Sequence, residues 1–413
     1  MRKLTAIMLL ISMLVSLAGC GTIQSTDLME DMKGIEVAYE EIVEDENAAV
    51  TDFAVRLLQN SMEEGENTLI SPLSVLVALA MTVNGAEGAT RTQMEEVLGM
   101  SAEDLNTYVH AYMESLPEEE GYKLSLANSI WFTDDEKFTV NEDFLQLNAD
   151  YYGAGIYETP FDDSTRKDIN LWVEENTDGM IKDILDEIPE EAVMYLVNAL
   201  AFEAEWPKAY EKSDVRADIF TMEDGTEQTV ELMHSSEYQY LEDENAKGFI
   251  KYYLGNKYAF AALLPNENVS VEEYVNSLTG ERLHAMLSEP VDISVTAAIP
   301  KFETEYDVEM SDVLKDMGMP LAFEPGLADF SNLGTDVAGN IFINRVLHKT
   351  FISVAEKGTK AGAATVVEMT DECAMVETVE PKKVILDRPF VYMLIDCEHQ
   401  IPFFIGTMMN MEK

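Results

Sequence analysis

A run of apolar residues from Leu73 to Val83 places the strongest limit on how this chain can fold. Ser71 and Pro72 precede it, and serine at the N-cap followed by proline at the first helical position is typical of a helix start. Because the run is apolar on nearly every side, a helix here must be surrounded by other elements. The chain therefore needs a large core, and its 413 residues, 47% of them hydrophobic, can supply one.

Other segments predict both helices and strands. Phe53, Leu57 and Leu58 recur at helical spacing. Strands are predicted for residues 258–264, for the alternating residues 291–299, and for a hairpin of residues 390–395 and 402–408. No Pro/Gly/Ser linker and no repeat divides the chain after residue 51, so we predict one large domain of the α+β class.

The charge balance excludes some partners. Against 78 acidic residues stand 27 basic ones, which gives a formal net charge of −51. Such a field repels nucleic acids and anionic membrane surfaces, so we expect no nucleic-acid partner.

The N-terminus predicts export. Arg2 and Lys3 precede an apolar run, residues 4–17, that is too short to span a membrane. Residues 17–20, Leu-Ala-Gly-Cys, resemble the lipobox of bacterial lipoproteins, whose cysteine is acylated; the alternative is an ordinary cleaved signal. We expect a signal peptide over residues 1–19, a lipid anchor on Cys20 and an acidic tether over residues 20–47. The protein would then face the extracellular side of the cell membrane, or the periplasm if the cell has an outer membrane.

A second notable stretch covers residues 358–369. Its alternate positions are small or apolar, whereas Lys360 and Glu368 fall on the other face. The alternate residues are Thr359, Ala361, Ala363, Thr365, Val367 and Met369. Side chains alternate across a strand, so this stretch could enter a sheet, although its flanks have the composition of an exposed loop.

Many short motifs of the chain resemble those of the serpins, a family of mainly serine-protease inhibitors. In family order they are residues 67–74 (Asn-Thr-Leu-Ile-Ser-Pro-Leu-Ser), 78–81 and 85–86, 170–173 with Thr177 and Gly179, 196–199 with Phe202 and Trp206, 300–302, 317–319, 328–331, 348–349 and 387–390. The resemblance implies a domain over residues 48–413 with three β-sheets, eight or nine helices and an exposed reactive loop at about residues 356–383.

The resemblance also implies a function. Serpins are metastable; a target protease cleaves the loop, becomes acyl-linked to it and is carried away as the loop inserts into the central sheet. We therefore expect a monomeric inhibitor of extracellular serine proteases, with cysteine proteases as a second possible target. We expect no enzyme activity, cofactor or metal. The alternative is a serpin-fold binding or carrier protein without inhibitory activity. A hydrolase is less consistent with the chain, which lacks Gly-x-Ser-x-Gly and His-Glu-x-x-His motifs.

Matching positions imply the working parts. The hinge would comprise Glu356, Gly358, Thr359, Ala361, Ala363, Ala364 and Thr365, in which glycine supplies torsional freedom and small side chains can enter the sheet. The shutter, where the sheet opens, would comprise Ser71, Ser74, Asn198 and His348. Trp206 matches the breach tryptophan at the loop's entry point. Outside this family, His348 could suggest a catalytic base and Ser71 a nucleophile; the family positions favour structural roles.

The scissile bond is less well defined. Counting forward from Glu356 places it between Glu372 and Cys373, whereas counting back from residues 389–390 places it near Thr378. We favour Glu372, because the length before the cut determines how far the protease is carried. Cleavage at Met369, Met375 or Thr378 would instead suit elastase-like proteases.

Overall fold

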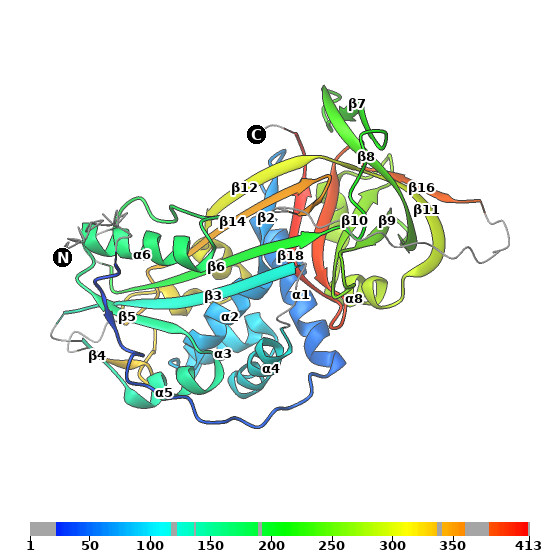
Figure 1. Ribbon diagram of the computed structural model, residues 1–413. Coiled ribbons are helices and arrows are strands. Elements are labelled where there is room, and N and C mark those ends of the chain that lie inside the picture. Colours follow the sequence, from blue (N-terminus) through cyan, green and yellow to red (C-terminus); the bar gives the residue numbers. More distant parts are fainter. Residues whose placement is uncertain are drawn as a thin grey trace, which may run out of the picture.

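The computed structural model describes residues 22–116, 122–135, 138–188, 192–336, 341–359 and 380–411. Within these residues, nine α-helices and three β-sheets form one mixed structure, shown in Figure 1. The α-helices are α1 (Glu44–Ser61), α2 (Pro72–Val83), α3 (Gly88–Leu98), α4 (Ala102–Ser115), α5 (Glu142–Tyr151), α6 (Asp163–Asn176), α7 (Val271–Ser277), α8 (Gly280–Ser288) and α9 (Ser311–Met317). The predicted α+β class is confirmed.

The long strands of a seven-stranded sheet run along the length of the molecule (Figure 1). Its order is β1 (Thr26–Asp27), β5 (Gly155–Thr159), β3 (Tyr122–Thr133), β6 (Met194–Glu205), β15 (Gly358–Thr359), β14 (Arg345–Ala355) and β12 (Phe302–Glu309). A nine-stranded sheet contains β16 (Lys382–Ile385), β11 (Val291–Pro300), β8 (Glu227–Glu242), β9 (Ala246–Tyr252), β10 (Tyr258–Pro265), β17 (Phe390–Asp396), β18 (Ile401–Met408) and β2 (Thr68–Ile70), with β7 (Val215–Thr221) paired to β8. The third pairs β4 (Phe138–Val140) with β13 (Gly334–Asp336).

Both faces of the seven-stranded sheet are covered. On β6, Tyr195 and Val197 pack in a small core with Trp172 of α6, whereas Leu196 and Leu200 belong to the main core that contains α2. Successive strand residues point to opposite faces, so a strand buried on both sides must be apolar throughout, as β6 nearly is. Opening this sheet therefore disturbs two packed layers.

The helix predicted after Ser71 is confirmed. All residues of α2 are buried, and the Ser71 hydroxyl accepts a hydrogen bond from the Ser74 amide at 3.3 Å. The strands predicted at 258–264 and 291–299 and the C-terminal hairpin are also present. The alternation expected from Val291 onward begins late, because β11 has an irregular register between Asp292 and Val295 that leaves Val291 53% exposed.

Residues 22–35, which we call the N-terminal strap, lie along the domain. Thr26 and Asp27 pair with the edge of β5, and the Leu28 amide donates to the Ile156 carbonyl at 2.8 Å. The buried carboxylate of Asp168 accepts bonds from the Gln24 and Ser25 amides and from the Ser25 hydroxyl, at 2.6–2.9 Å. Residues 22–28, within the segment expected to be an acidic tether, are therefore bound to α6 and β5.

Candidate functional site

The base of the predicted reactive loop already lies inside the seven-stranded sheet. After β14 the chain turns at Glu356 and Lys357 and returns as β15, between β14 and β6. Gly358 pairs with Ala355 and Glu205, and Thr359 pairs with Val354 and Ala204. Farther along, β6 and β14 pair directly with each other, from Tyr195 with Arg345 to Ala199 with Lys349. Gly358 and Thr359 thus already lie between β6 and β14. A longer inserted strand would extend from these two residues between the same two neighbours.

Gly358 is required by a close backbone approach. Its φ of 152° is one that residues with a side chain rarely adopt. A Cβ atom at this position would lie 2.0 Å from the Ala204 carbonyl oxygen and 2.8 Å from the Glu205 Cα atom. Torsional freedom was expected here; the structure adds that β15 fits between its neighbours only without a side chain at its first residue.

Thr359 points into the protein. It is 1% exposed, and its hydroxyl hydrogen-bonds to the Tyr253 hydroxyl at 2.5 Å. The Tyr253 ring stacks on Trp206, with ring centroids 4.3 Å apart. A charged side chain at residue 359 would lose its solvation in this aromatic environment.

Trp206 and Tyr210 hold the turn that precedes β15. The Trp206 indole N–H donates to the Ala355 carbonyl, and its amide donates to the Lys357 carbonyl, both at 2.9 Å. The Tyr210 amide donates to the Glu356 carbonyl at 2.9 Å. The predicted breach tryptophan therefore contacts the loop base through both its side chain and its backbone.

A largely buried ion pair lies against these two rings. The Lys251 ammonium is 2.8 Å from Glu237 Oε1, 5.1 Å from the Trp206 ring centroid and 4.9 Å from the Tyr210 ring centroid. Ser235 donates a second hydrogen bond to Glu237 at 2.6 Å and meets the Tyr210 hydroxyl at 3.2 Å. Burial alone would lower the pKa of Lys251, but Tyr210 and Glu237 outweigh burial and raise it.

A second ion pair is more exposed. The Lys301 ammonium lies 2.8 Å from Glu356 and 3.0 Å from Glu231. Its hydrogen bond lowers the pKa of Glu356, and the two carboxylates raise the pKa of Lys301. Lys301 thereby links the start of the loop to the nine-stranded sheet, where Glu231 lies on β8.

The four predicted shutter residues come together beneath the sheet. His348 Nε2 accepts a hydrogen bond from the Ser71 amide at 3.0 Å, so its proton is on Nδ1, which donates to Asn198 Oδ1 at 2.6 Å. The Ser74 hydroxyl donates to the same oxygen at 3.0 Å. All four residues are buried, and burial lowers the pKa of His348 to about 3. The Ser71 hydroxyl caps α2, and His348 contacts the Ser71 amide, so the two do not form a nucleophile and base pair.

The chain matches the model of the serpin family (serine protease inhibitor) over residues 48–411. It belongs to the serpin family. This serpin is 48% identical to the thermophilic serpin Tengpin in its native state, with a TM-score of 0.89, over 94% of this chain and 100% of that one. For the latent state of Tengpin, the TM-score is 0.80 at 47% identity, over 91% of this chain and 100% of that one.

Curated relatives and distant structures agree with this assignment. An uncharacterized serpin-like protein of Thermococcus kodakarensis is 32% identical over 88% of this serpin and 85% of its own length. Human thyroxine-binding globulin, solved with its ligand, shares the fold with a TM-score of 0.77 at 23% identity, over 89% of this serpin and 99% of that chain. The predicted family and serpin fold are confirmed.

The remaining predicted site residues lie outside the described part of the serpin. They are Cys20 and the loop residues Ala361, Ala363, Ala364, Thr365, Met369, Glu372, Cys373, Met375 and Thr378. Sequence reasoning missed Tyr253, Lys251 and Glu237 at the loop base. The available signal was weak, because Lys251 is one of two lysines in β9 and nothing in the sequence separates it from Lys247.

Two general features of the described residues bear on chemistry and location. No group of three or more His, Cys, Asp or Glu side chains among them is arranged to hold a metal ion. None of their helices has both the length and the apolar character needed to cross a membrane.

Proposed function

We propose that this serpin is a suicide-substrate inhibitor of extracellular serine proteases. The observation that carries the proposal is the position of β15 between β6 and β14, with Thr359 buried against Tyr253. A loop whose first residues already pair with both flanking strands can extend that pairing residue by residue. The family is generally composed of protease inhibitors rather than enzymes, which agrees with this use of the loop.

The proposed reaction begins as ordinary proteolysis. The protease serine oxygen attacks the carbonyl carbon of the scissile bond, the amide nitrogen leaves with a proton, and an ester joins the loop to the protease. Insertion of the freed loop between β6 and β14 then carries the protease away before water can hydrolyse the ester. Newly formed strand hydrogen bonds and burial of the small inward side chains drive this step.

The position of the scissile bond and the lipid anchor are two further parts of the proposal. We propose Glu372–Cys373 as the scissile bond, with Met369, Met375 and Thr378 as alternatives, and cysteine proteases as additional targets. We further propose that Cys20 carries lipid, which would hold a monomeric protein on the outer side of the cell membrane. The apolar run and small residues that precede Cys20 support this location.

The alternative is a carrier or binding protein without inhibitory activity. A shared fold with thyroxine-binding globulin keeps this alternative open, because one fold hosts several functions. The loop base favours inhibition. Its inward residue is a threonine, and the paired glycine permits close strand contact.

The test mixes the purified protein with trypsin-like, chymotrypsin-like, elastase-like and Glu-specific serine proteases. We expect an SDS-stable conjugate with at least one of these proteases. Sequencing of the released fragment then locates the scissile bond. Thr359→Arg should abolish the conjugate while the loop is still cleaved, whereas Thr229→Arg, at an exposed position on β8, should leave it intact. Cleavage by every protease without conjugate would refute inhibition and favour the carrier.

A further inference from the structure

The two residues of β15 fix the register that a longer inserted strand would continue. Thr359 is paired with Ala204 on β6 and with Val354 on β14. Both pairings are antiparallel, so each further residue of the loop would lie opposite the preceding residue of β6 and of β14. The partners that residues 360–369 would meet after insertion therefore follow from the sequence.

Both charged residues of this stretch would meet a residue of the opposite charge. Lys360 would lie opposite Glu203 on β6. Glu368 would lie between Tyr195 on β6 and Arg345 on β14, which are at present paired with each other in register. Opposite charges on directly facing strand residues stabilise a pairing, whereas like charges destabilise it.

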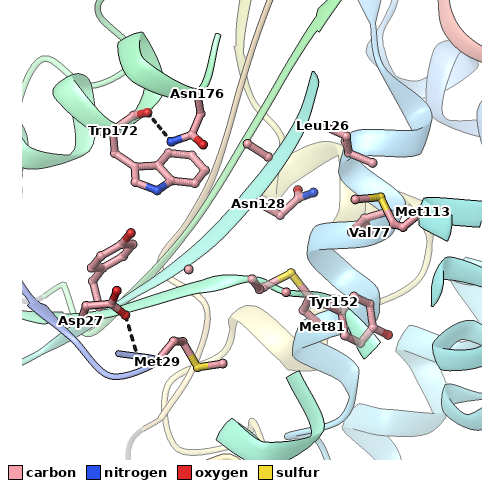
Figure 2. A pocket seen from close by; sticks show the side chains of 15 residues that line it. Asp27, Met29, Val77, Met81, Met113, Leu126, Asn128, Tyr152, Trp172 and Asn176 are labelled. Atoms are coloured by element: carbon pink, nitrogen blue, oxygen red, sulfur yellow. Dashed lines mark hydrogen bonds between the residues drawn. The ribbon is translucent and has the colours of Figure 1, made fainter. Parts of the chain in front are cut away.

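The same register matches the helix that covers the sheet. On the α6 side, β6 is fully buried at Val197 and Ala199. Figure 2 shows the Trp172 ring pointing from α6 toward the strands of this sheet. The loop residues that would lie opposite these two positions, Val366 and Ala364, are apolar and fit under the helix.

Arg345 is placed to change partners when the sheet opens. Its guanidinium carbon is 6.0 Å from the Tyr195 ring centroid, so this contact crosses the junction between β14 and β6. Arg345 is only partly buried, and it forms no ion pair with another residue that the structure describes. One inserted strand would widen the junction by about 4.8 Å and break the contact with Tyr195. The Glu368 carboxylate would then lie beside the guanidinium, where a charge-assisted hydrogen bond can form.

Other registers would place this carboxylate badly. A shift by one residue would turn both loop charges toward the main core. A shift by two residues keeps the faces, but in one direction it brings Glu368 opposite Val197 and Leu347, which are buried. A carboxylate there would lose its solvation without gaining a counter-charge. The loop charges therefore discriminate between registers that small apolar side chains alone would tolerate.

We propose that Glu203 and Arg345 are positioning residues for loop insertion, a step that belongs to the function proposed above. They pair with Lys360 and Glu368 and so fix the register and the depth of the inserted strand. The first pair lies at the entry of the loop, and the second lies about 26 Å farther along the sheet. A loop in the wrong register would stop short and give water time to hydrolyse the ester.

The test follows the cleaved loop by hydrogen exchange. The full chain is cut by a protease that cleaves only after residue 370, and mass spectrometry measures amide exchange over residues 366–370. We expect these amides to be protected in the unaltered cleaved chain. In Glu368→Arg or Arg345→Glu, two like charges meet, so exchange should be about 5-fold to 50-fold faster. The double variant reverses the pair and should restore the original rate, which a merely structural role of Arg345 would not do.

Glu380→Arg is the matched control. It makes the same change of net charge at an exposed residue beyond every candidate scissile bond, so exchange over residues 366–370 should stay unchanged. An unchanged rate in Glu368→Arg, or no recovery in the double variant, would overturn the proposal. Absence of protection in the unaltered cleaved chain would overturn both this proposal and inhibition by loop insertion.

Conjugate formation with the protease is scored separately on a denaturing gel. Protected loop amides and recovery in the double variant, without any conjugate, would support the charge pairs and refute inhibition. A conjugate together with an unchanged exchange rate in Glu368→Arg would support inhibition and refute the charge pairs.

Discussion

His348 on β14 lies directly opposite Asn198 on β6, and a 2.6 Å hydrogen bond joins His348 Nδ1 to Asn198 Oδ1. The same imidazole accepts from the amide of Ser71, at the start of α2. These bonds cross the line along which β6 and β14 must separate if the loop inserts further. The neutral histidine therefore helps to keep the sheet closed below β15.

The first prediction concerns pH. Burial lowers the pKa of His348 to about 3 from an ordinary value of 6.5, so between these values the unfolded chain binds a proton that the folded chain does not. This contribution to stability is complete above about pH 6.5 and is lost as the pH falls toward 3, by about 1.4 kcal/mol per pH unit. His348→Gln should remove that part of the slope of unfolding free energy against pH, measured by urea denaturation.

Ser74→Ala provides the control for this experiment. It removes a hydrogen bond to Asn198 without removing a titratable group, so it should lower stability at every pH but keep the slope. If His348→Gln and Ser74→Ala gave the same slope, the neutral buried histidine would not explain the acid sensitivity.

The second prediction concerns the close approach at Gly358. Gly358→Ala would place a methyl group against the Ala204 carbonyl, so β15 should leave the sheet at a penalty of about 1–3 kcal/mol. Hydrogen exchange of the Trp206 and Tyr210 amides, which bond to the turn before β15, should then accelerate. Gly225→Ala also falls at a positive φ but meets no atom within 4 Å, so exchange at the loop base should be unchanged.

The third prediction compares the two ion pairs. Lys251→Met would leave the largely buried Glu237 carboxylate without its counter-charge, at a loss of about 3–5 kcal/mol in unfolding free energy. Adding Glu237→Leu should recover much of that loss. Lys301→Met affects a more exposed pair and should lower stability by about 1 kcal/mol or less, and less still at high salt. Similar losses for both lysines, measured by urea denaturation, would contradict this ranking.

The fourth prediction concerns the attachment of the N-terminal strap. Asp168→Leu removes the acceptor of three hydrogen bonds, so the Gln24 and Ser25 amides should exchange about 10-fold to 100-fold faster. The control is Asp163→Leu, at an exposed position on the same helix. If the Gln24 and Ser25 amides exchanged at the original rate in Asp168→Leu, other contacts would hold the strap.

The proximity of Ser71, Ser74, Asn198 and His348 was predictable because family motifs match these positions residue by residue. Ser71, Ser74, Asn198 and His348 lie up to 277 residues apart, and neither periodicity nor composition would have brought them together. Local rules worked where the signal was local: the cap at Ser71 and the all-apolar run after it predicted α2 correctly.

The missed features depend on tertiary contacts. A lysine in a strand is expected to be exposed to solvent. Only the folded sheet places Lys251 against the rings of Trp206 and Tyr210. The N-terminal strap has a polar and acidic sequence that does not predict its contacts. The open edge of β5 and the carboxylate of Asp168 supply the hydrogen bonds that hold it. A strand of two residues, such as Thr26–Asp27, is too short to show the alternating pattern from which a strand is predicted.

The N-terminal strap also determines which way the molecule would face if it were tethered. In register, it joins the sheet at the level of Met194 on β6, whereas β15 joins at Ala204, about 33 Å farther along at the usual rise per residue. A surface holding the chain by residues just before the strap would therefore be nearest the end of the sheet remote from Thr359. The end where the loop starts would then point outward, toward approaching proteases.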